Sequence, residues 1–161
     1  MDIFLGVEKS QADLEMLRHR GLNRVYVGLE TGHDPLLGFL EKPGTSADAV
    51  ELVRRLKGAG IGVGIIILVG AGGRRYAAAH VAATLAVLRR MPLDAGDFIY
   101  LSPLVLERTA SHARAAQEAG MVPLSPAELR DQGAALMAGI RTLGFRSFPR
   151  VATYDICDFL Y

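Results

Sequence analysis

The stretch GIGVGIIILVGAGG, residues 60–73, constrains the fold more than any other part of the sequence. Its centre, residues 62–69, is an almost unbroken apolar run that ends in Gly70, Gly72 and Gly73. Such a run predicts a strand that is apolar on both faces, as in a parallel sheet covered on both sides. The glycines would let the backbone approach a ligand closely, because no Cβ intervenes. A plain turn explains them equally well.

The rest of the chain alternates between strand and helix patterns. We expect further strands at residues 2–7, 24–30 and 97–104, and helices at residues 10–21, 46–59, 76–91, 109–119 and 125–144. No hairpin turn joins the strands, so parallel pairing through right-handed crossovers is expected. The predicted fold class is α/β, with a parallel sheet of about four strands and crossover helices, followed by a C-terminal helix and an aromatic tail. Residues 1–161 are expected to form one domain.

In folds of this kind, ligands bind at the carboxyl ends of the strands. Glu30 ends the second strand in VYVGLETGHD, and a carboxylate there can accept hydrogen bonds from sugar hydroxyls; the alternative is an exposed loop charge. The helix expected near Tyr76 would direct its first amides toward the same region. The glycine turn lacks the spacing of a dinucleotide-binding motif and the Gly-Lys-Ser/Thr of a P-loop.

Composition excludes several classes of protein. A formal net charge of +1 gives no electrostatic case for nucleic acid or an acidic membrane surface. The single cysteine, Cys157, rules out an internal disulfide and a cysteine-rich metal site, and it favours a reducing compartment. The N-terminal residues do not resemble a signal peptide, and no apolar run is long enough for a membrane helix. We therefore expect a cytoplasmic protein.

No catalytic set stands out in the sequence, so the catalytic residues stay unassigned. His33, His80 and His112 are far apart and lack the spacing of metal ligands, so no metal site is expected. His80 lies on an apolar helix face, where a partly buried histidine with satisfied nitrogens is the simpler interpretation. Cys157 has no evident base beside it and is interpreted as a packed thiol.

Taken together, the motifs resemble a family. A GLETG strand end is followed by a Leu-Leu…Lys-Pro-Gly-Thr segment, by an amphipathic helix ending in AGI, and by an apolar strand ending in GAGG. A histidine-bearing helix, AAAHVAATLAVL, and a later LSPL strand end follow in order. Over residues 12–145 this order resembles the C-terminal half of the core of radical SAM enzymes, in the branch of coproporphyrinogen oxidase and the Elp3-like proteins.

The resemblance implies a partial or full (β/α) barrel of the TIM type that binds S-adenosylmethionine (SAM) at its strand ends. Glu30 and Thr31 match positions that contact the ribose or methionine part of SAM. Ile66, Leu68 and Gly70 match a segment that flanks adenine, and Gly72 belongs to the adjoining glycine turn. The usual Gly-x-Ile-x-Gly-x-x-Glu pattern is broken, with Ile66 at the first glycine and Gly73 at the glutamate.

The CxxxCxxC loop that holds the four-iron four-sulfur cluster of the family has no counterpart here, since Cys157 is the only cysteine. We therefore expect that this chain alone does not bind the cluster and does not cleave SAM reductively. Three hypotheses remain. In the first, the chain is the C-terminal half of a split or truncated radical SAM enzyme with a complementary N-terminal half. In the second, it is a non-catalytic half-barrel that binds a partner or forms a homodimer. In the third, it is a cluster-independent module that binds SAM or nucleotides.

Overall fold

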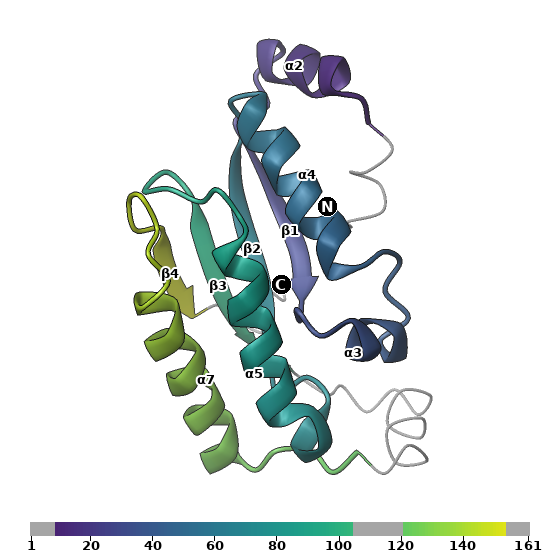
Figure 1. Ribbon diagram of the computed structural model, residues 1–161, viewed down its shortest axis with the longest axis vertical. Coiled ribbons are helices and arrows are strands. Elements are labelled where there is room, and N and C mark those ends of the chain that lie inside the picture. Colours follow the sequence, from purple (N-terminus) through teal and green to yellow (C-terminus); the bar gives the residue numbers. More distant parts are fainter. Residues whose placement is uncertain (1–8, 105–120, 154–161) are drawn as a thin grey trace, which may run out of the picture.

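Four parallel strands form one sheet in the order β1-β2-β3-β4 (Figure 1). The structure is a computed structural model, and it describes residues 9–104 and 121–153. The strands are β1 (Arg24–Glu30), β2 (Gly62–Val69), β3 (Phe98–Pro103) and β4 (Arg150–Thr153). The predicted α/β class with about four parallel strands is confirmed. The described strands form an open sheet, so closure into a barrel stays a prediction.

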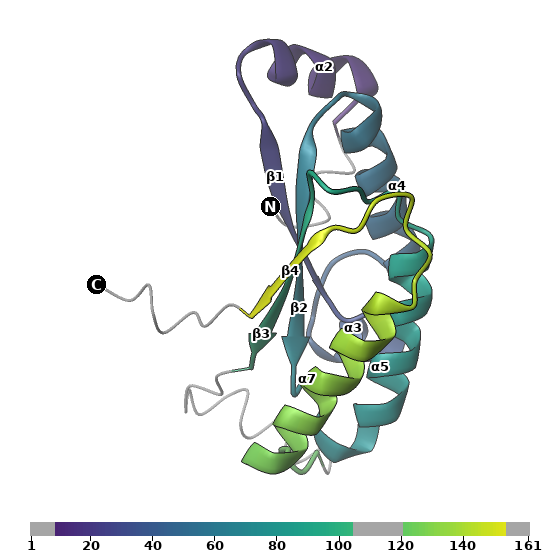
Figure 2. The ribbon, with the colours of Figure 1, turned by 90° about the vertical axis from the view of Figure 1, so that its left-hand side faces the viewer.

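The helices lie on one side of this sheet. They are α2 (Gln11–His19), α3 (Asp34–Phe39), α4 (Ser46–Gly58), α5 (Gly73–Arg89) and α7 (Pro126–Arg141). Figure 2 shows α4, α5 and α7 against one face of the sheet, and none of the described helices covers the opposite face. The strand pattern predicted cover on both faces, whereas the described residues provide it on one.

The helix-covered face is the hydrophobic core. Alternate residues of the strands point into it, and all are buried: Val25, Val27 and Leu29 in β1, Val63, Ile65, Ile67 and Val69 in β2, and Ile99 and Leu101 in β3. The intervening residues lie on the opposite face, which we call the bare face: Arg24, Tyr26 and Gly28 in β1, Gly64, Ile66 and Leu68 in β2, and Phe98, Tyr100 and Ser102 in β3.

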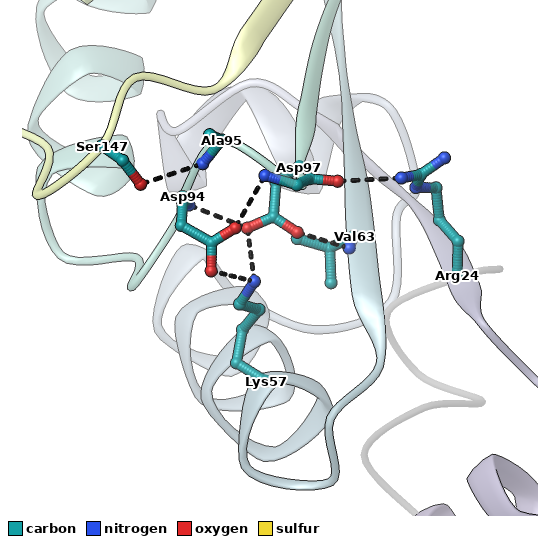
Figure 3. Close-up of polar contacts among 8 residues, drawn as sticks. Arg24, Lys57, Val63, Asp94, Ala95, Asp97 and Ser147 are labelled. Atoms are coloured by element: carbon teal, nitrogen blue, oxygen red, sulfur yellow. Dashed lines mark hydrogen bonds and ion pairs between the residues drawn. The ribbon is translucent and has the colours of Figure 1, made fainter.

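Charged groups fix the amino ends of the strands together (Figure 3). The Lys57 ammonium lies 2.6 Å from a carboxylate oxygen of Asp97 and 2.8 Å from one of Asp94. Asp97 is fully buried, and its other carboxylate oxygen accepts a hydrogen bond from the Val63 amide at 2.8 Å. Arg24 donates to the carbonyl of Gly96 at 2.8 Å. These contacts, which we call the amino-end latch, tie α4, β1 and β2 to the loop before β3.

Most expected elements are present within one to three residues of the sequence-based bounds. The side chains of Ser10, Thr45 and Ser125 cap α2, α4 and α7, each within a complete capping box. Helix α5 begins at Gly73 rather than near Tyr76, because Gly72 adopts a left-handed conformation at its N-cap. Helix α3 and strand β4 were not predicted. The strand expected at residues 2–7 and the helix at 109–119 lie outside the described residues.

No helix in residues 9–104 or 121–153 has both the length and the apolar character needed to span a bilayer.

Candidate functional site

The chain makes an unusual turn where β1 ends. Glu30 has a φ of +60°, and the Thr31 amide donates to the Leu29 carbonyl at 2.6 Å. A bond between residues i and i+2 around a positive φ describes the rarer, strained form of the γ-turn. Such a conformation costs about 1–3 kcal/mol for a non-glycine residue and persists only where surrounding contacts impose it. Backbone strain of this kind clusters at ligand-binding sites, which supports the prediction that Glu30 is functional.

The turn lays the Glu30 carboxylate back over the bare face. A Cβ added to Gly28 would lie 2.8 Å from a carboxylate oxygen of Glu30, so only glycine at position 28 leaves this space. The pairing of β1 with β2 shifts register between Gly28 and Glu30, as in a β-bulge. The ammonium of Lys42 lies 3.0 Å from the carboxylate, whose side chain is 13% exposed. The carboxylate is thus held in place yet remains reachable.

Two further predicted residues lie beside this carboxylate. Ile66 pairs with Gly28 on one side and with Tyr100 on the other, and Leu68 pairs with Ser102. Both side chains are partly exposed on the bare face, at its carboxyl end. Glu30, Ile66 and Leu68 therefore form one surface, with a hydrogen-bond acceptor beside an apolar floor. Such a surface can bind a molecule that carries both hydroxyl or amino groups and a flat apolar ring.

Thr31 is placed differently from Glu30. It is fully buried on the helix side of the turn, where its hydroxyl lies 2.8 Å from Nδ1 of His80 and accepts from the His33 amide at 3.1 Å. Thr31 therefore anchors the turn to α5, and its side chain does not share the surface formed by Glu30, Ile66 and Leu68.

Gly70 and Gly72 have structural reasons to be glycine. Both adopt positive φ, and an added Cβ would lie 2.6 Å from Leu129 at position 70 and 2.7 Å from Tyr76 at position 72. The Gly70 amide donates to the side chain of the buried Gln132 at 2.7 Å. These contacts favour the plain-turn interpretation of the glycines, while a backbone approach to a ligand stays a prediction.

The first amides of α5 are engaged by the protein itself. Gly73 donates to the Gly70 carbonyl at 3.1 Å, and Arg74 donates to the Val122 carbonyl at 2.9 Å. These two amides are therefore already satisfied.

His80 only half matches its expected role as a partly buried histidine with satisfied nitrogens. Its side chain is fully buried, and Nδ1 contacts Thr31, but Nε2 has no hydrogen-bond partner among the described residues. Burial lowers the pKa of His80 to about 4, and the neighbouring His33 adds to this effect. The imidazole is therefore neutral at pH 7.

Sequence reasoning missed an aromatic and cationic group at the amino end of the bare face. The rings of Tyr26 and Tyr100 lie 5.9 Å apart, and Phe98 stacks on Tyr100 at 5.6 Å. The guanidinium groups of Arg24 and Arg150 lie 4.4 Å and 5.4 Å from the Phe98 ring. Tyr26 is 44% exposed. The sequence does show these residues at alternate positions of their strands. Only the pairing register of the strands, however, shows that they form a cluster.

A separate cavity of about 730 Å³ lies between the ends of α5 and α7. Arg89 and residues 91–94 and 142–146 line it, so it contains none of the predicted site residues.

Comparison with known proteins does not assign a family: no protein-family model matches this chain, and no curated protein does either. The donor set of the chain does not fit an iron–sulfur cluster, because clusters are held by several thiolates and Cys157 is the single cysteine. Among the described residues, no group of three or more histidine, cysteine or acidic side chains lies close enough to hold a metal ion.

Proposed function

We propose that this chain contributes one wall of a SAM-type binding pocket, as the C-terminal half of a radical SAM-like barrel. The observation that carries the proposal is the Glu30 turn, which holds a carboxylate at the carboxyl end of a parallel sheet, over the bare face. Glu30 would accept hydrogen bonds from the ribose hydroxyls or the amino group of the ligand. Ile66 and Leu68 would pack against the adenine ring.

The environment of Glu30 fits this role. The carboxylate does not lie free in solvent, since Gly28 makes room for it and Lys42 fixes its direction. A preorganised acceptor loses little freedom when a ligand binds, and this increases affinity. The bare face would correspond to the interior of a closed barrel, and a complementary N-terminal half would complete both the barrel and the pocket. The radical chemistry of the family would require cluster thiolates from outside this chain, so no catalytic step is assigned to its residues.

Titration calorimetry with SAM and with adenosine tests the proposal directly. We expect the wild-type chain to bind SAM, and Glu30→Gln to weaken binding by about tenfold or more, because a hydrogen bond to a charged group contributes about 1.5–3 kcal/mol. Glu51→Gln is the matched control, since Glu51 is an exposed α4 carboxylate whose oxygen lies 3.9 Å from Arg54. Absence of heat with both ligands at millimolar concentration contradicts the proposed pocket.

The split-enzyme part of the proposal has its own test in the genomic sequence. We expect a CxxxCxxC segment upstream, in the same or a neighbouring reading frame. If none is present, the radical SAM assignment is rejected while the binding pocket can still stand.

A second candidate function is suggested by the aromatic and cationic group of the bare face. A face of a parallel sheet that no described helix covers, with a 44% exposed Tyr26, favours association with a partner or a second copy. Sedimentation velocity at micromolar concentration should then show a dimer in the wild type and a monomer in Tyr26→Lys. A wild-type chain that sediments as a monomer argues against self-association.

A further inference from the structure

The turn that carries Glu30 is fastened to α5 by two hydrogen bonds. The hydroxyl of Thr31 lies 2.8 Å from Nδ1 of His80, and the amide of Gly32 donates to the hydroxyl of Thr84 at 2.9 Å. His80 and Thr84 are one helical turn apart, so they present their polar atoms on the same face of α5. All four residues are buried. The contact therefore forms without competition from bulk water.

The turn also packs on α5 with almost no space between the two backbones. A Cβ on Gly32 would lie 2.5 Å from the Ala83 carbonyl oxygen and 2.7 Å from the Thr84 Cα. This close approach sets the distance at which Thr31 meets His80. Together, the glycine and the two hydrogen bonds fix the position of residues 31 and 32 relative to the helix.

Glu30 is the last residue of β1, and it lies between the fully buried Leu29 and these anchored residues. The chain has to connect a fixed strand to a fixed anchor through a single residue. The positive φ of Glu30 is the result of that constraint, since nothing in a glutamate side chain favours the left-handed region. If the anchor were released, Glu30 could relax to a common conformation and its carboxylate would leave the space above Gly28.

Building on the proposed function, we propose that His80 is a positioning residue of this site, and that its hydrogen bond to Thr31 holds Glu30 in the left-handed turn with its carboxylate on the bare face. His80 does not touch the ligand in this arrangement. It lies on the core side of the sheet and acts through Thr31. The role explains why a histidine occupies a fully buried position on an otherwise apolar helix face, where leucine or valine would pack with less desolvation.

Four variants separate positioning from general stability. His80→Leu removes the hydrogen bond, while His80→Asn retains a polar atom close to the position of Nδ1. Val87→Ala is the control, because Val87 is a buried α5 residue that belongs to the hydrophobic core. Thr31→Val removes this hydrogen bond from the turn side, together with the bond that the Thr31 hydroxyl accepts from the His33 amide, and it keeps the experiment decisive if His80→Leu fails to fold.

Two measurements are made on each variant. The first uses the NMR chemical shifts of Glu30 Cα and Cβ without ligand, which report whether its φ is positive. The second is the dissociation constant for SAM. We expect His80→Leu and Thr31→Val to lose the left-handed signature and to bind SAM about tenfold more weakly. His80→Asn should restore both readouts substantially, and Val87→Ala should lower the unfolding midpoint while leaving both readouts as in the wild type.

The inference is overturned if His80→Leu or Thr31→Val keeps the Glu30 shifts of the wild type. It is also overturned if His80→Asn is as impaired as His80→Leu, or if Val87→Ala changes the Glu30 shifts as much. A wild-type chain that does not bind SAM refutes the proposed function instead, and the NMR readout then decides the positioning role by itself.

Discussion

The two ends of the sheet hold their charged and polar groups in opposite ways. At the amino end, Lys57 binds two carboxylates, and Asp97 accepts from both Lys57 and Val63; one buried nitrogen of the latch, Arg24 Nε, lacks a hydrogen-bond partner among the described residues. At the carboxyl end, Glu30 has strained backbone geometry, and buried nitrogens of His33 and His80 lack hydrogen-bond partners among the described residues.

This difference indicates a division of labour along the strands. Burial lowers the pKa of Lys57, but its hydrogen bonds to Asp94 and Asp97 outweigh that effect and raise the pKa overall, while the pKa of Asp94 falls through its bond to Lys57. Both shifts favour the charged forms of Lys57 and Asp94, and so they stabilise the ion pair between them. The carboxyl end instead maintains a conformation that costs free energy, which agrees with the binding role proposed for Glu30.

The largest effect should come from breaking the latch. Asp97→Ala leaves Lys57 without its buried partner and the Val63 amide without an acceptor, so we expect a loss of about 3–5 kcal/mol in the free energy of unfolding. Urea unfolding followed by circular dichroism measures this loss. The Glu30 chemical shifts should remain those of the wild type in the folded fraction, and a large change in them would contradict the separation of the two ends.

We expect the free energy of unfolding to decrease at acidic pH, because His80 has a lowered pKa in the folded protein. Its pKa in the folded protein, about 4, lies below the ordinary value of 6.5, so the unfolded chain binds a proton that the folded protein does not. Stability is then fully present above pH 6.5 and falls as the pH drops toward 4, by about 3 kcal/mol from this group. Because carboxylates also titrate near pH 4, the difference between wild type and His80→Asn is the informative quantity. Equal pH dependence in both proteins would argue against a buried neutral His80.

Adding one methyl group to Gly32 should separate the turn from α5. Gly32→Ala places a Cβ against the backbone of Ala83, and we expect destabilisation of about 1–3 kcal/mol together with loss of the Glu30 signature. Gly38→Ala is the matched control, because no atom lies within 4 Å of its added Cβ and it belongs to α3. This control should be neutral or slightly stabilising in thermal unfolding, since alanine favours a helix more than glycine does.

We expect the smallest effect on stability for Glu30→Gly. This variant should also separate stability from binding most clearly. Glycine adopts a positive φ without penalty, which should offset the lost ion pair with Lys42 and leave the free energy of unfolding within about 1 kcal/mol of the wild type. SAM binding should nevertheless disappear. A destabilisation of several kcal/mol would show that Glu30 serves the fold.

The central strands, and most of the helices between them, could be predicted from local sequence patterns. The apolar run of residues 62–69 and the capping residues Thr45 and Ser125 define elements without reference to the rest of the chain. Strand β4 could not be predicted, because its four residues include a single β-branched apolar side chain and depend on pairing with β3. Helix α3 begins at Asp34 without a side-chain cap, so its start carried little signal.

The candidate site was predicted only in part, because some of its contacts join residues that are far apart in the sequence. The strand-end position of Glu30 follows from topology. Ile66 and Leu68 were selected by the resemblance, and alternation along β2 places them on the bare face. The contact between Thr31 and His80 joins residues 49 positions apart, and no local pattern encodes it. The same holds for Gly70, whose neighbour Leu129 becomes known only with the tertiary structure.

The tyrosines of the bare face also make the protein its own optical probe. The chain has no tryptophan, so its ultraviolet emission comes from five tyrosines, and two of them, Tyr26 and Tyr100, face each other across Gly64. Burial raises the pKa of the Tyr100 phenol, and the neighbouring Tyr26 raises it further, so this pair is sensitive to its surroundings. We expect tyrosine fluorescence to change when the bare face is covered, without any added label. The covering molecule can be a complementary half, a second copy or a ligand.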